Sequence, residues 1–524
     1  MRRLCLLILL YLLLPACEKK SALERAWPVD PAAFAEAVRP PRAYDPGVLP
    51  NDFLGLNQSL ISGAPAPPLP DAPVMENDQR MLTLDIIGVG LSVEMFRQGD
   101  VWHELKQADS FSANVMPPRD SPRWRHANGP GVLEKRQADT LELALKAMVE
   151  AWPIPSVTVV PTDANDWLRE IRSDERLREM DGRFINSTRM PAGLHWTQIK
   201  QLDVVYSDTP EDVIEAIFRT FERSPDMPAL LVYGKGPRGK YDAPRTASTP
   251  LATYAAMVVA RRERVEWLRP WAPYTQMGED TIYPGFWKWA QTPPKPFKPT
   301  PFFPTPWTRG HFKQWDELPT LAKLHRPVVA RLTDEQGTPL KRQAQHEALV
   351  EGWKQAAGET YINSVFFDTG KAGTGIATLS PVLRQLKGNP DLLDPKEGID
   401  LFARLGETGA ASPFVQLVLA TMAAAESKRA SMVVPMRRPD QVTMIQVSPS
   451  DDEIPSYMFK PRLLPQTSQA PDVPEQQPAA PRYVAPMSMD REAVAAGRKA
   501  LDELLREGGP GAVGIGGRKG LGFD

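Results

Sequence analysis

The chain has 524 residues, of which 42% are hydrophobic, and its 62 basic and 64 acidic residues give a net charge of −2. This length is too great for one small core and predicts two domains or one large duplicated domain. The charge balance gives no reason to expect a nucleic-acid partner, which would need a clear basic excess. Both cysteines, Cys5 and Cys17, lie near the N-terminus, so the body of the chain has no disulfide, thiolate metal site or cysteine nucleophile.

The first residues follow the pattern of a bacterial export signal. Two arginines precede an apolar run from Leu4 to Leu14, which is too short to be a comfortable membrane span. The run leads into LPAC (residues 14–17), which is similar to a lipoprotein cleavage box. We therefore expect a signal peptide at 1–16, lipidation at Cys17, and a location in the cell envelope, lipid-anchored and facing the periplasm. The alternatives are an uncleaved anchor, or a misassigned start that leaves the protein in the cytoplasm.

The next part of the chain divides into a tether and an α/β region. Residues 17–80 hold few periodic segments and include the run GAPAPPLPDAP, which predicts a tether and a proline-rich arm. From Met81, strands and helices alternate, as in α/β layers. The pattern predicts strands at 82–93 (with a glycine turn), 156–160, 202–207, 229–236 and 254–263. It predicts helices at 101–108, 139–152 and 210–224.

A segment rich in proline and aromatic residues, from Tyr283 to Trp307, follows the first α/β set. Its prolines exclude a long regular strand or helix, so we interpret it as an extended connection. Its aromatic side chains are either anchors for a partner or rings that pack onto the domain that the segment crosses. The candidate partner contacts are Trp287, Trp289, Phe302, Phe303 and Trp307.

A second α/β set follows this connection. The pattern predicts strands at 325–334 and 362–370, helices at 343–358 and 376–386, and a closing pair of strands at 431–437 and 442–448. Between them, RLGETGAASPFVQLVLA (residues 404–420) predicts a glycine turn and a helix that is apolar on nearly all faces, as an enclosed helix must be. A short amphipathic helix at 491–508 either contacts a partner or docks loosely.

In this order the elements resemble the thiolase and ketosynthase fold, in which two similar α/β halves pack in layers around central buried helices. The fold class is therefore α/β, with thiolase-like duplicated halves plus a proline-rich tether and tail. The expected organisation is a signal at 1–16, a tether and arm at 17–80, an N-terminal half at 81–270, a connection at 271–320, a C-terminal half at 321–455, and a linker, short helix and glycine-rich tail at 456–524.

The resemblance implies a cysteine nucleophile and two catalytic histidines. Residues 208–236 look like the nucleophile turn, its buried helix and the next strand, but no cysteine lies near Glu211. VFFDTGKAGTG (365–375) stands at the first histidine segment and contains no histidine. GETGAASPF (406–414) stands at the second, where Glu407 replaces the histidine and would repel a developing oxyanion. We therefore expect no condensation reaction, no catalytic residue, no cofactor and no metal.

The whole chain also resembles bacterial adaptors for lipase effectors of the type VI secretion system. This likeness rests on IIGVGLSVEMFRQGDVWHELKQ, GFWKWAQTPPKPF and the stretch from TGAASPFVQLVLA to VSPSDDE. It implies a non-catalytic protein that binds a phospholipase or lipase toxin and helps deliver it to the secretion spike. One alternative is an envelope lipoprotein with a structural or toxin-sequestering, immunity-like role. Another is an enzyme that uses Glu407 and Asp368 for a different reaction.

Other motifs are weaker. GKGPRG (234–239) matches G-x-G-x-x-G after a strand, but Pro237 and the lack of a following helix favour a basic loop over a dinucleotide site. There is no G-x-S-x-G motif, as a serine lipase of the usual hydrolase type would have. The six histidines lack metal-binding spacing. RRER (261–264) is interpreted as a solvated strand end.

Overall fold

The computed structural model describes residues 80–94, 96–116, 132–150, 152–162, 174–194, 197–207, 209–236, 252–272, 297–370, 373–386, 390–454 and 459–460. All of them belong to one compact unit, Met1–Leu464. The predicted signal, almost all of the tether and arm, and the helix at 491–508 lie outside the described residues.

Five main strands form the sheet of the N-terminal half. They are β1 (Thr83–Val93), β3 (Ile154–Val160), β4 (Ile199–Tyr206), β5 (Ala229–Lys235) and β6 (Thr253–Ala260). Their spatial order is β1-β6-β5-β3-β4. β3 runs parallel to β4 and β5, whereas β6 is antiparallel to both β5 and β1.

The C-terminal half repeats this pattern. Its strands are β7 (Ala322–His325), β9 (Ile362–Asp368), β10 (Gly398–Asp400), β11 (Ala430–Pro435) and β12 (Gln441–Pro449), in the spatial order β7-β12-β11-β9-β10. β9 is parallel to β10 and β11, and β12 is antiparallel to β11 and β7. Both halves thus share one strand order and one set of directions, which confirms the predicted duplication. An antiparallel pairing of β1 with β7 joins the two halves into one sheet.

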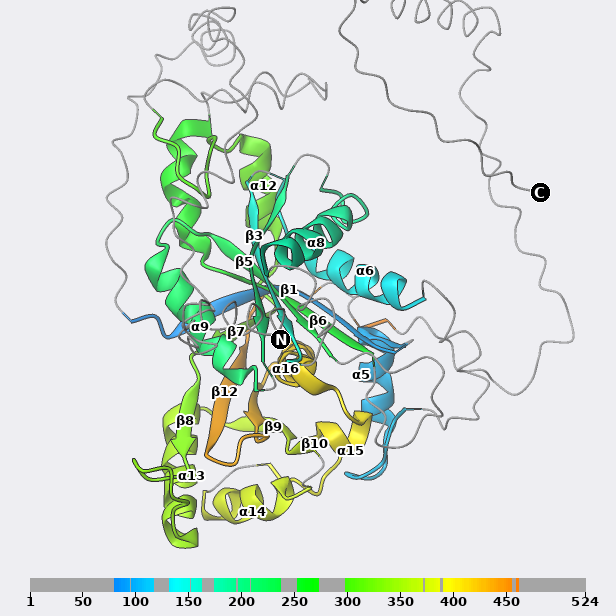
Figure 1. Cartoon of the computed structure of the whole chain (residues 1–524), viewed down its shortest axis with the longest axis vertical. Coiled ribbons are helices and arrows are strands. Elements are labelled where there is room, and N and C mark those ends of the chain that lie inside the picture. Colours follow the sequence, from blue (N-terminus) through cyan, green and yellow to red (C-terminus); the bar gives the residue numbers. More distant parts are fainter. Residues whose placement is uncertain are drawn as a thin grey trace, which may run out of the picture. The chain divides into compact units, whose positions relative to one another are not determined.

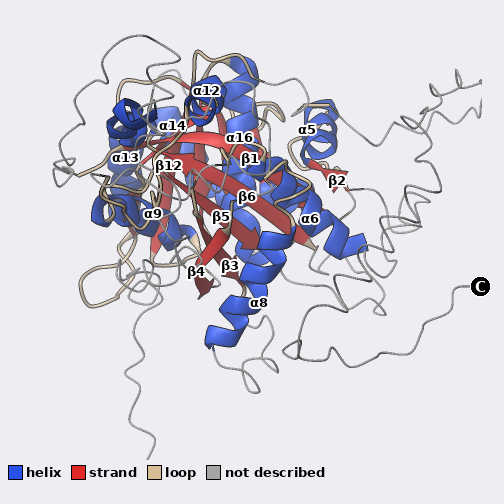
Figure 2. Cartoon of the chain, turned by 90° about the horizontal axis from the view of Figure 1, so that it is seen from above, coloured by secondary structure: helices blue, strands red, loops and turns tan. Residues whose placement is uncertain are grey.

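The helices cover the faces of this sheet. In the first half they are α5 (Gln98–Gln107), α6 (Val132–Leu145), α8 (Asp174–Ser187), α9 (Glu211–Arg223), the 3-10 helix η3 (Arg262–Trp271) and α12 (Arg309–Glu317). In the second they are α13 (Arg342–Ala357), α14 (Gly375–Gln385), α15 (Leu401–Leu405), the short 3-10 helix η5 (Gly409–Ala411) and α16 (Ser412–Ser427). α6 packs on β1 and β6, α8 on β4, and α13 on β8 (Val328–Arg331) and β12 (Figure 2).

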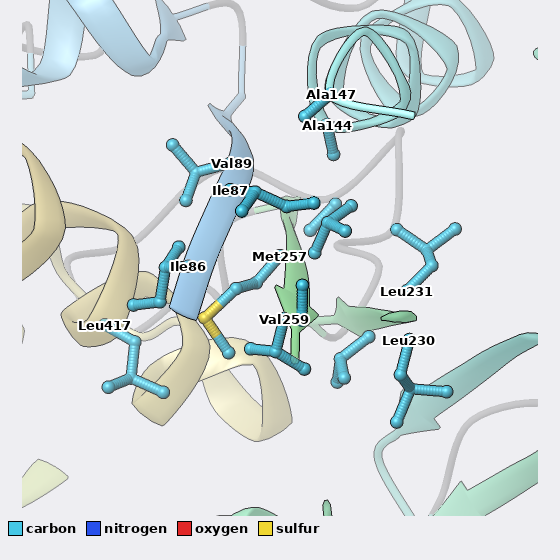
Figure 3. Packing of buried hydrophobic residues seen from close by; sticks show 14 of the residues in the cluster. Ile86, Ile87, Val89, Ala144, Ala147, Leu230, Leu231, Met257, Val259 and Leu417 are labelled. Atoms are coloured by element: carbon cyan, nitrogen blue, oxygen red, sulfur yellow. The ribbon is translucent and has the colours of Figure 1, made fainter. Parts of the chain in front are cut away.

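α16 is the central helix of the fold. It contacts β1 and β6 of one half and β9, β11 and β12 of the other, and it lies between the two sets of strands (Figure 1). Every residue from Ser412 to Ala425 is buried. Leu417 lies beside Ile86 of β1, with Met257 and Val259 of β6 close by (Figure 3). The enclosed helix predicted from its apolar sequence is therefore confirmed. Each large apolar side chain buried in this way contributes about 2 kcal/mol.

α9 is less enclosed than the resemblance implied. Val213, Ile217 and Phe221 face the core, whereas Arg219 and Arg223 are exposed. The amphipathic sequence explains this, because charged side chains recur on the opposite face of the helix.

The structure also revises several predicted elements. The segment predicted as a strand with a glycine turn is the single strand Thr83–Val93, and its glycines allow close helix packing: a Cβ on Gly90 would lie 2.0 Å from the carbonyl oxygen of Thr140 in α6. The single strand predicted at 325–334 is two strands, β7 and β8, separated at Pro327, which has no N–H for a ladder. The helix predicted at 139–152 begins earlier and ends at Leu145.

Candidate functional site

The three segments that resemble ketosynthase catalytic segments meet at one charged cluster. Its centre is Arg437, which follows β11. Arg437 donates from Nε to Oδ2 of Asp368 at 2.9 Å, at the end of β9, and from Nη1 to Oε1 of Glu407 at 2.6 Å, in the turn before α16. Burial alone would lower the pKa of Arg437, but the two carboxylates outweigh it and raise the pKa. One guanidinium thus holds both carboxylates that the sequence singled out.

Further hydrogen bonds fix both carboxylates in place. The Asp368 side chain is only 1% exposed and accepts from the Ser412 hydroxyl and, at 2.7 Å, from the backbone N–H of Gly370. Glu407 accepts from the backbone N–H of Gly409 at 2.7 Å. Ser412, the first residue of α16, is itself buried. This arrangement ties the start of α16 to the ends of β9 and β11.

The neighbouring Arg438 connects this cluster to the first half of the chain. It donates from Nη1 to Asp212 Oδ2 at 2.5 Å, near the start of α9, and from Nη2 to Asp440 Oδ2 at 2.6 Å. Gln441 adds a contact from Nε2 to Asp212 Oδ1 at 3.3 Å. Glu211, the first residue of α9, is buried beside them, and burial raises its pKa to about 7. The segment expected at the nucleophile turn therefore presents carboxylates to arginines.

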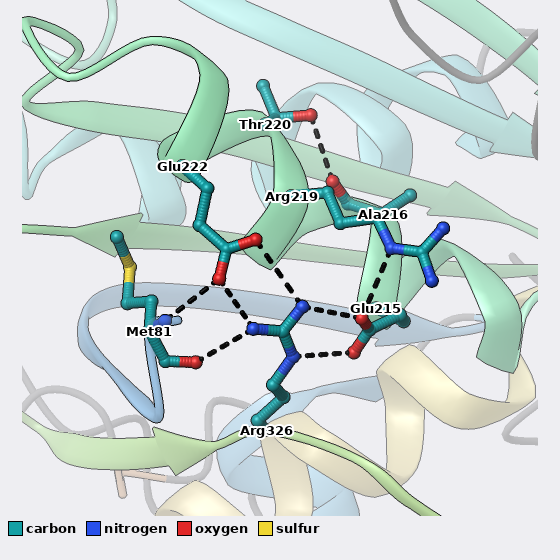
Figure 4. Close-up of polar contacts among 7 residues, drawn as sticks. All are labelled: Met81, Glu215, Ala216, Arg219, Thr220, Glu222 and Arg326. Atoms are coloured by element: carbon teal, nitrogen blue, oxygen red, sulfur yellow. Dashed lines mark hydrogen bonds and ion pairs between the residues drawn. The ribbon is translucent and has the colours of Figure 1, made fainter. Parts of the chain in front are cut away.

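A second ionic contact between the halves lies further along α9 (Figure 4). Arg326, between β7 and β8, donates to Glu215 at 2.9 and 2.6 Å, to Glu222 at 2.5 Å, and to the carbonyl oxygen of Met81 at 3.1 Å. Burial alone would raise the pKa of Glu222, but the hydrogen bonds from Arg326 and Met81 outweigh it, and the pKa is lowered. α9 is thus held to the second half near both of its ends.

Three of the five candidate partner contacts are buried in the domain. Phe302, Phe303 and Trp307 are at most 2% exposed. The Trp307 ring centroid lies 5.1 Å from that of Trp152 and 5.5 Å from that of Trp315. These three side chains pack on the domain that the segment crosses, and they are not free to anchor a partner.

The remaining candidate site residues lie outside the described part of the chain. Trp287, Trp289 and Cys17 are among them, so their roles stay predictions. No helix among the residues that the structure describes is long and apolar enough to cross a membrane.

Gly234 and Gly236 of the G-x-G-x-x-G match have a packing role. A Cβ on Gly234 would lie 2.6 Å from the Phe414 ring, and one on Gly236 would lie 2.7 Å from the carbonyl oxygen of Thr408. The two glycines let β5 approach the start of α16 closely.

The interpretation of RRER as a solvated strand end is wrong. Arg264 is buried and donates to the carbonyl oxygens of Phe221 at 2.8 Å, Ser224 at 2.6 Å and Met227 at 3.1 Å. It therefore donates to carbonyl groups at and just beyond the C-terminal end of α9, where a helix leaves carbonyl groups without partners of its own. Arg262 bonds Thr320 and the carbonyl oxygens of Trp315 and Leu318 at the end of α12.

Sequence reasoning missed the arginines that organise the site. Nothing in the local sequence around Arg326, Arg437 or Arg438 distinguishes them from surface residues. The one available indication is position, because Arg437 and Arg438 come shortly after a buried strand that ends at Pro435.

Solved structures with a similar layout include several ketosynthases. The ketosynthase from module 1 of the bacillaene synthase of Bacillus amyloliquefaciens FZB42 is 11% identical, with 84% of this chain and 82% of that chain covered and a TM-score of 0.41. The ishigamide ketosynthase/chain length factor is 12% identical, with coverages of 70% and 99% and a TM-score of 0.38. The 3-oxoacyl-[acyl-carrier-protein] synthase III of Aquifex aeolicus VF5 is 11% identical, with coverages of 70% and 99% and a TM-score of 0.32.

The family assignment comes from the sequence of both halves. Residues 82–250 match the N-terminal model of the type VI lipase adapter protein Tla3, and residues 321–449 match the C-terminal model of the same family. Together the two matches span more than half of the chain, the first covering β1 to β5 and the second covering β7 to β12. The chain therefore belongs to the Tla3 family of type VI lipase adapter proteins.

Proposed function

We propose that this protein is a non-catalytic adaptor that binds a phospholipase or lipase toxin and assists its delivery by a type VI secretion system. The family supports the adaptor role. The lack of catalysis is supported by one observation above all: Arg437 engages both Asp368 and Glu407. A carboxylate held in this way is a poor general base, because its oxygens already accept hydrogen bonds from the guanidinium and from neighbouring N–H and O–H groups. The alternative of an enzyme that uses these two residues is therefore disfavoured.

The aromatic residues that flank positions 273–296 support a contact role for Trp287 and Trp289. Trp271 and Phe297 are described residues on either side of positions 273–296, and their ring centroids lie 5.3 Å apart. Trp267 stacks on Phe297 with centroids 5.9 Å apart. Both tryptophans lie in the sequence between these packed residues, and we propose that they contact the effector. The secretion spike protein is a second proposed partner.

Co-purification tests this role directly. The lipase effector of the same secretion system, expressed with the tagged adaptor, is expected to elute with it under gentle conditions as a defined complex. Purified adaptor alone is expected to show no ester hydrolysis and no acyl condensation. Failure to co-elute, or a turnover that Glu407→Ala abolishes in a folded protein, would contradict the proposal.

We further propose that the protein is anchored by lipid at Cys17 and faces the periplasm, on the basis of its LPAC sequence. A structural or toxin-sequestering role in the envelope is the alternative that this location would favour. Metabolic lipid labelling of wild type and Cys17→Ala separates the locations. Label that depends on Cys17, together with membrane fractionation, places the mature protein in the envelope. An unlabelled soluble protein that is unchanged by the substitution places it in the cytoplasm.

A further inference from the structure

Two apolar side chains are exposed at the junction of the two halves. Leu82, the residue before β1, is 66% exposed, and Val329 of β8 is 45% exposed. The backbone N–H of Arg326 donates to the carbonyl oxygen of Leu82 at 2.8 Å, and Arg326 is three residues before Val329. Three extended residues span about 10 Å, so Leu82 and Val329 lie in one small region, which we call the junction patch.

Leu82 belongs to the face of the sheet that carries the main core. Side chains alternate along an extended chain, so Leu82 shares a face with Leu84. Leu84 lies opposite Leu324 of β7, and both are buried in the same core as α16. This face is therefore covered at Leu84 and exposed two residues earlier.

Val329 points to the same face. It lies opposite Thr443 of β12. Thr443 is four residues before Val447, which lies opposite Leu324 and belongs to the same core. An even separation along a strand keeps side chains on one face, so Val329 and Leu82 share it.

The backbone beside the junction patch is fixed by side chains of both halves (Figure 4). The N–H of Met81 donates to Oε1 of Glu222 at 2.8 Å, and the Met81 carbonyl oxygen accepts from Nη1 of Arg326 at 3.1 Å. The Met81 side chain is buried. The chain that precedes Arg80 therefore starts from a fixed point next to the patch.

The arm carries apolar side chains within reach of this point. Residues 1–79 lie outside the described part of the chain. Val74 and Met75 are the large apolar residues nearest to Arg80 on this side, and the polar run ENDQ separates them from it. Six extended residues span about 20 Å, which is long enough to return to the junction patch.

We propose that residues 69–79 fold back on the domain and cover the junction patch with Val74 and Met75. The size of the patch favours this occupant, because two side chains fall far below the roughly 1,000 Å² that a stable interface between separate proteins buries. A segment joined to the patch by a few residues has an effective concentration in the millimolar range and needs little contact area. Pro70 and Pro73 also limit the conformations that the segment loses on docking. The tether expected at 17–80 is then shortened to the residues before 69.

Disulfide trapping in the full chain tests this inference. Cys5→Ala and Cys17→Ala remove the natural cysteines, and Val74→Cys is then combined either with Val329→Cys or with Met190→Cys. Met190 is 55% exposed and follows α8, which packs on β4, four strands away from β1, so it serves as the matched control. In a glutathione redox buffer, the effective concentration of the thiol pair at 74 and 329 is expected to exceed that at 74 and 190 by at least about tenfold.

Equal effective concentrations for the two pairs would overturn the inference. Linked dimers whose yield rises with protein concentration would also overturn it, because a second copy would then cover the patch. A bond between positions 74 and 329 that forms only after the effector is added would do the same, because the arm alone would not be docked.

Proteolysis gives a check that needs no cysteine. Leu82→Lys combined with Val329→Lys is expected to speed thermolysin cleavage between Val74 and Met75 about tenfold, because a docked segment resists cleavage until it is released. Met190→Lys is expected to leave the rate unchanged. Equal cleavage rates in these two variants would contradict the proposal.

Discussion

The guanidinium of Arg404 lies in the second half of the chain and donates from Nη2 to the carbonyl oxygen of Leu105, at the end of α5 in the first half, at 2.9 Å. Its Nη1 donates to the carbonyl oxygen of Ser110 at 3.0 Å, and the residue is fully buried. Burial lowers the pKa of Arg404. A single arginine therefore satisfies carbonyl groups where α5 ends.

Arg404→Met is expected to lower the free energy of unfolding by about 2 to 3 kcal/mol, because the buried carbonyl group of Leu105 loses its charged donor and the exposed residue Ser110 loses a second one. Denaturant titration measures this change. Arg342→Met, at an exposed position on α13, is the control and is expected to change stability by less than about 0.5 kcal/mol. Equal effects of the two substitutions would show that the Arg404 contacts add nothing to stability.

Arg437→Met is expected to destabilise the protein by about 3 kcal/mol, because the buried Asp368 and the half-buried Glu407 would remain without a counter-charge. Combining it with Asp368→Asn and Glu407→Gln removes those charges and is expected to recover part of the loss. Denaturant titration of the wild type, Arg437→Met, the double variant Asp368→Asn with Glu407→Gln, and the triple variant forms a coupling test. If the losses of unfolding free energy simply add, the three residues do not act as one coupled cluster.

Gly236→Ala is expected to lower stability by about 1 to 3 kcal/mol, because the new Cβ would meet the backbone of Thr408. Gly310→Ala is the matched control. It lies in α12, where the nearest atom to a new Cβ is 3.6 Å away, and alanine favours the helix. Thermal unfolding is expected to show a lower midpoint for the first variant and an equal or higher one for the second. A tolerated Gly236→Ala would contradict the close packing of β5 on the start of α16.

The variant His311→Gln tests whether this histidine makes the folded protein less stable in acid. Burial lowers the pKa of His311 to about 4, and its Nδ1 accepts from the backbone N–H of Thr308 at 3.2 Å. The unfolded chain takes up this proton more readily, so the wild type is expected to lose at most about 3 kcal/mol as the pH falls from about 6.5 to about 4. The glutamine oxygen can accept the same hydrogen bond without titrating. A smaller acid-induced loss of stability in the variant supports this assignment, and identical profiles exclude it.

Local sequence pattern predicted the elements whose structure depends on their own composition. The apolar run 414–420 gave an enclosed helix, and the short apolar runs gave most strands, including the closing pair β11 and β12. Helices α8, α12 and η3 were not predicted, because their sequences lack a clear apolar period or lie in a proline-rich stretch. The charged site could not be predicted from local sequence. Its residues, Asp212, Asp368, Glu407 and Arg437, are brought together only by long-range pairing of strands.

Trp287→Ala combined with Trp289→Ala is expected to weaken effector binding by about 2 kcal/mol or more, roughly thirtyfold, because buried tryptophans dominate many interfaces. Titration calorimetry with the purified effector measures this loss, and the melting temperature of the adaptor is expected to stay unchanged. Tyr361→Ala removes an exposed aromatic residue elsewhere and serves as the control. Unchanged affinity in the double variant would exclude these two residues as contacts.

The most direct test of an adaptor without catalysis is effector delivery in cells that lack this protein, complemented with wild type or with Glu407→Gln. The amount of lipase effector reaching target cells is the measurement, with equal adaptor levels verified. We expect delivery to fail without the adaptor and to be restored equally by both forms, because glutamine can still accept a hydrogen bond from Arg437. Delivery without the adaptor, or restoration by wild type alone although Glu407→Gln folds and binds the effector, would contradict this account.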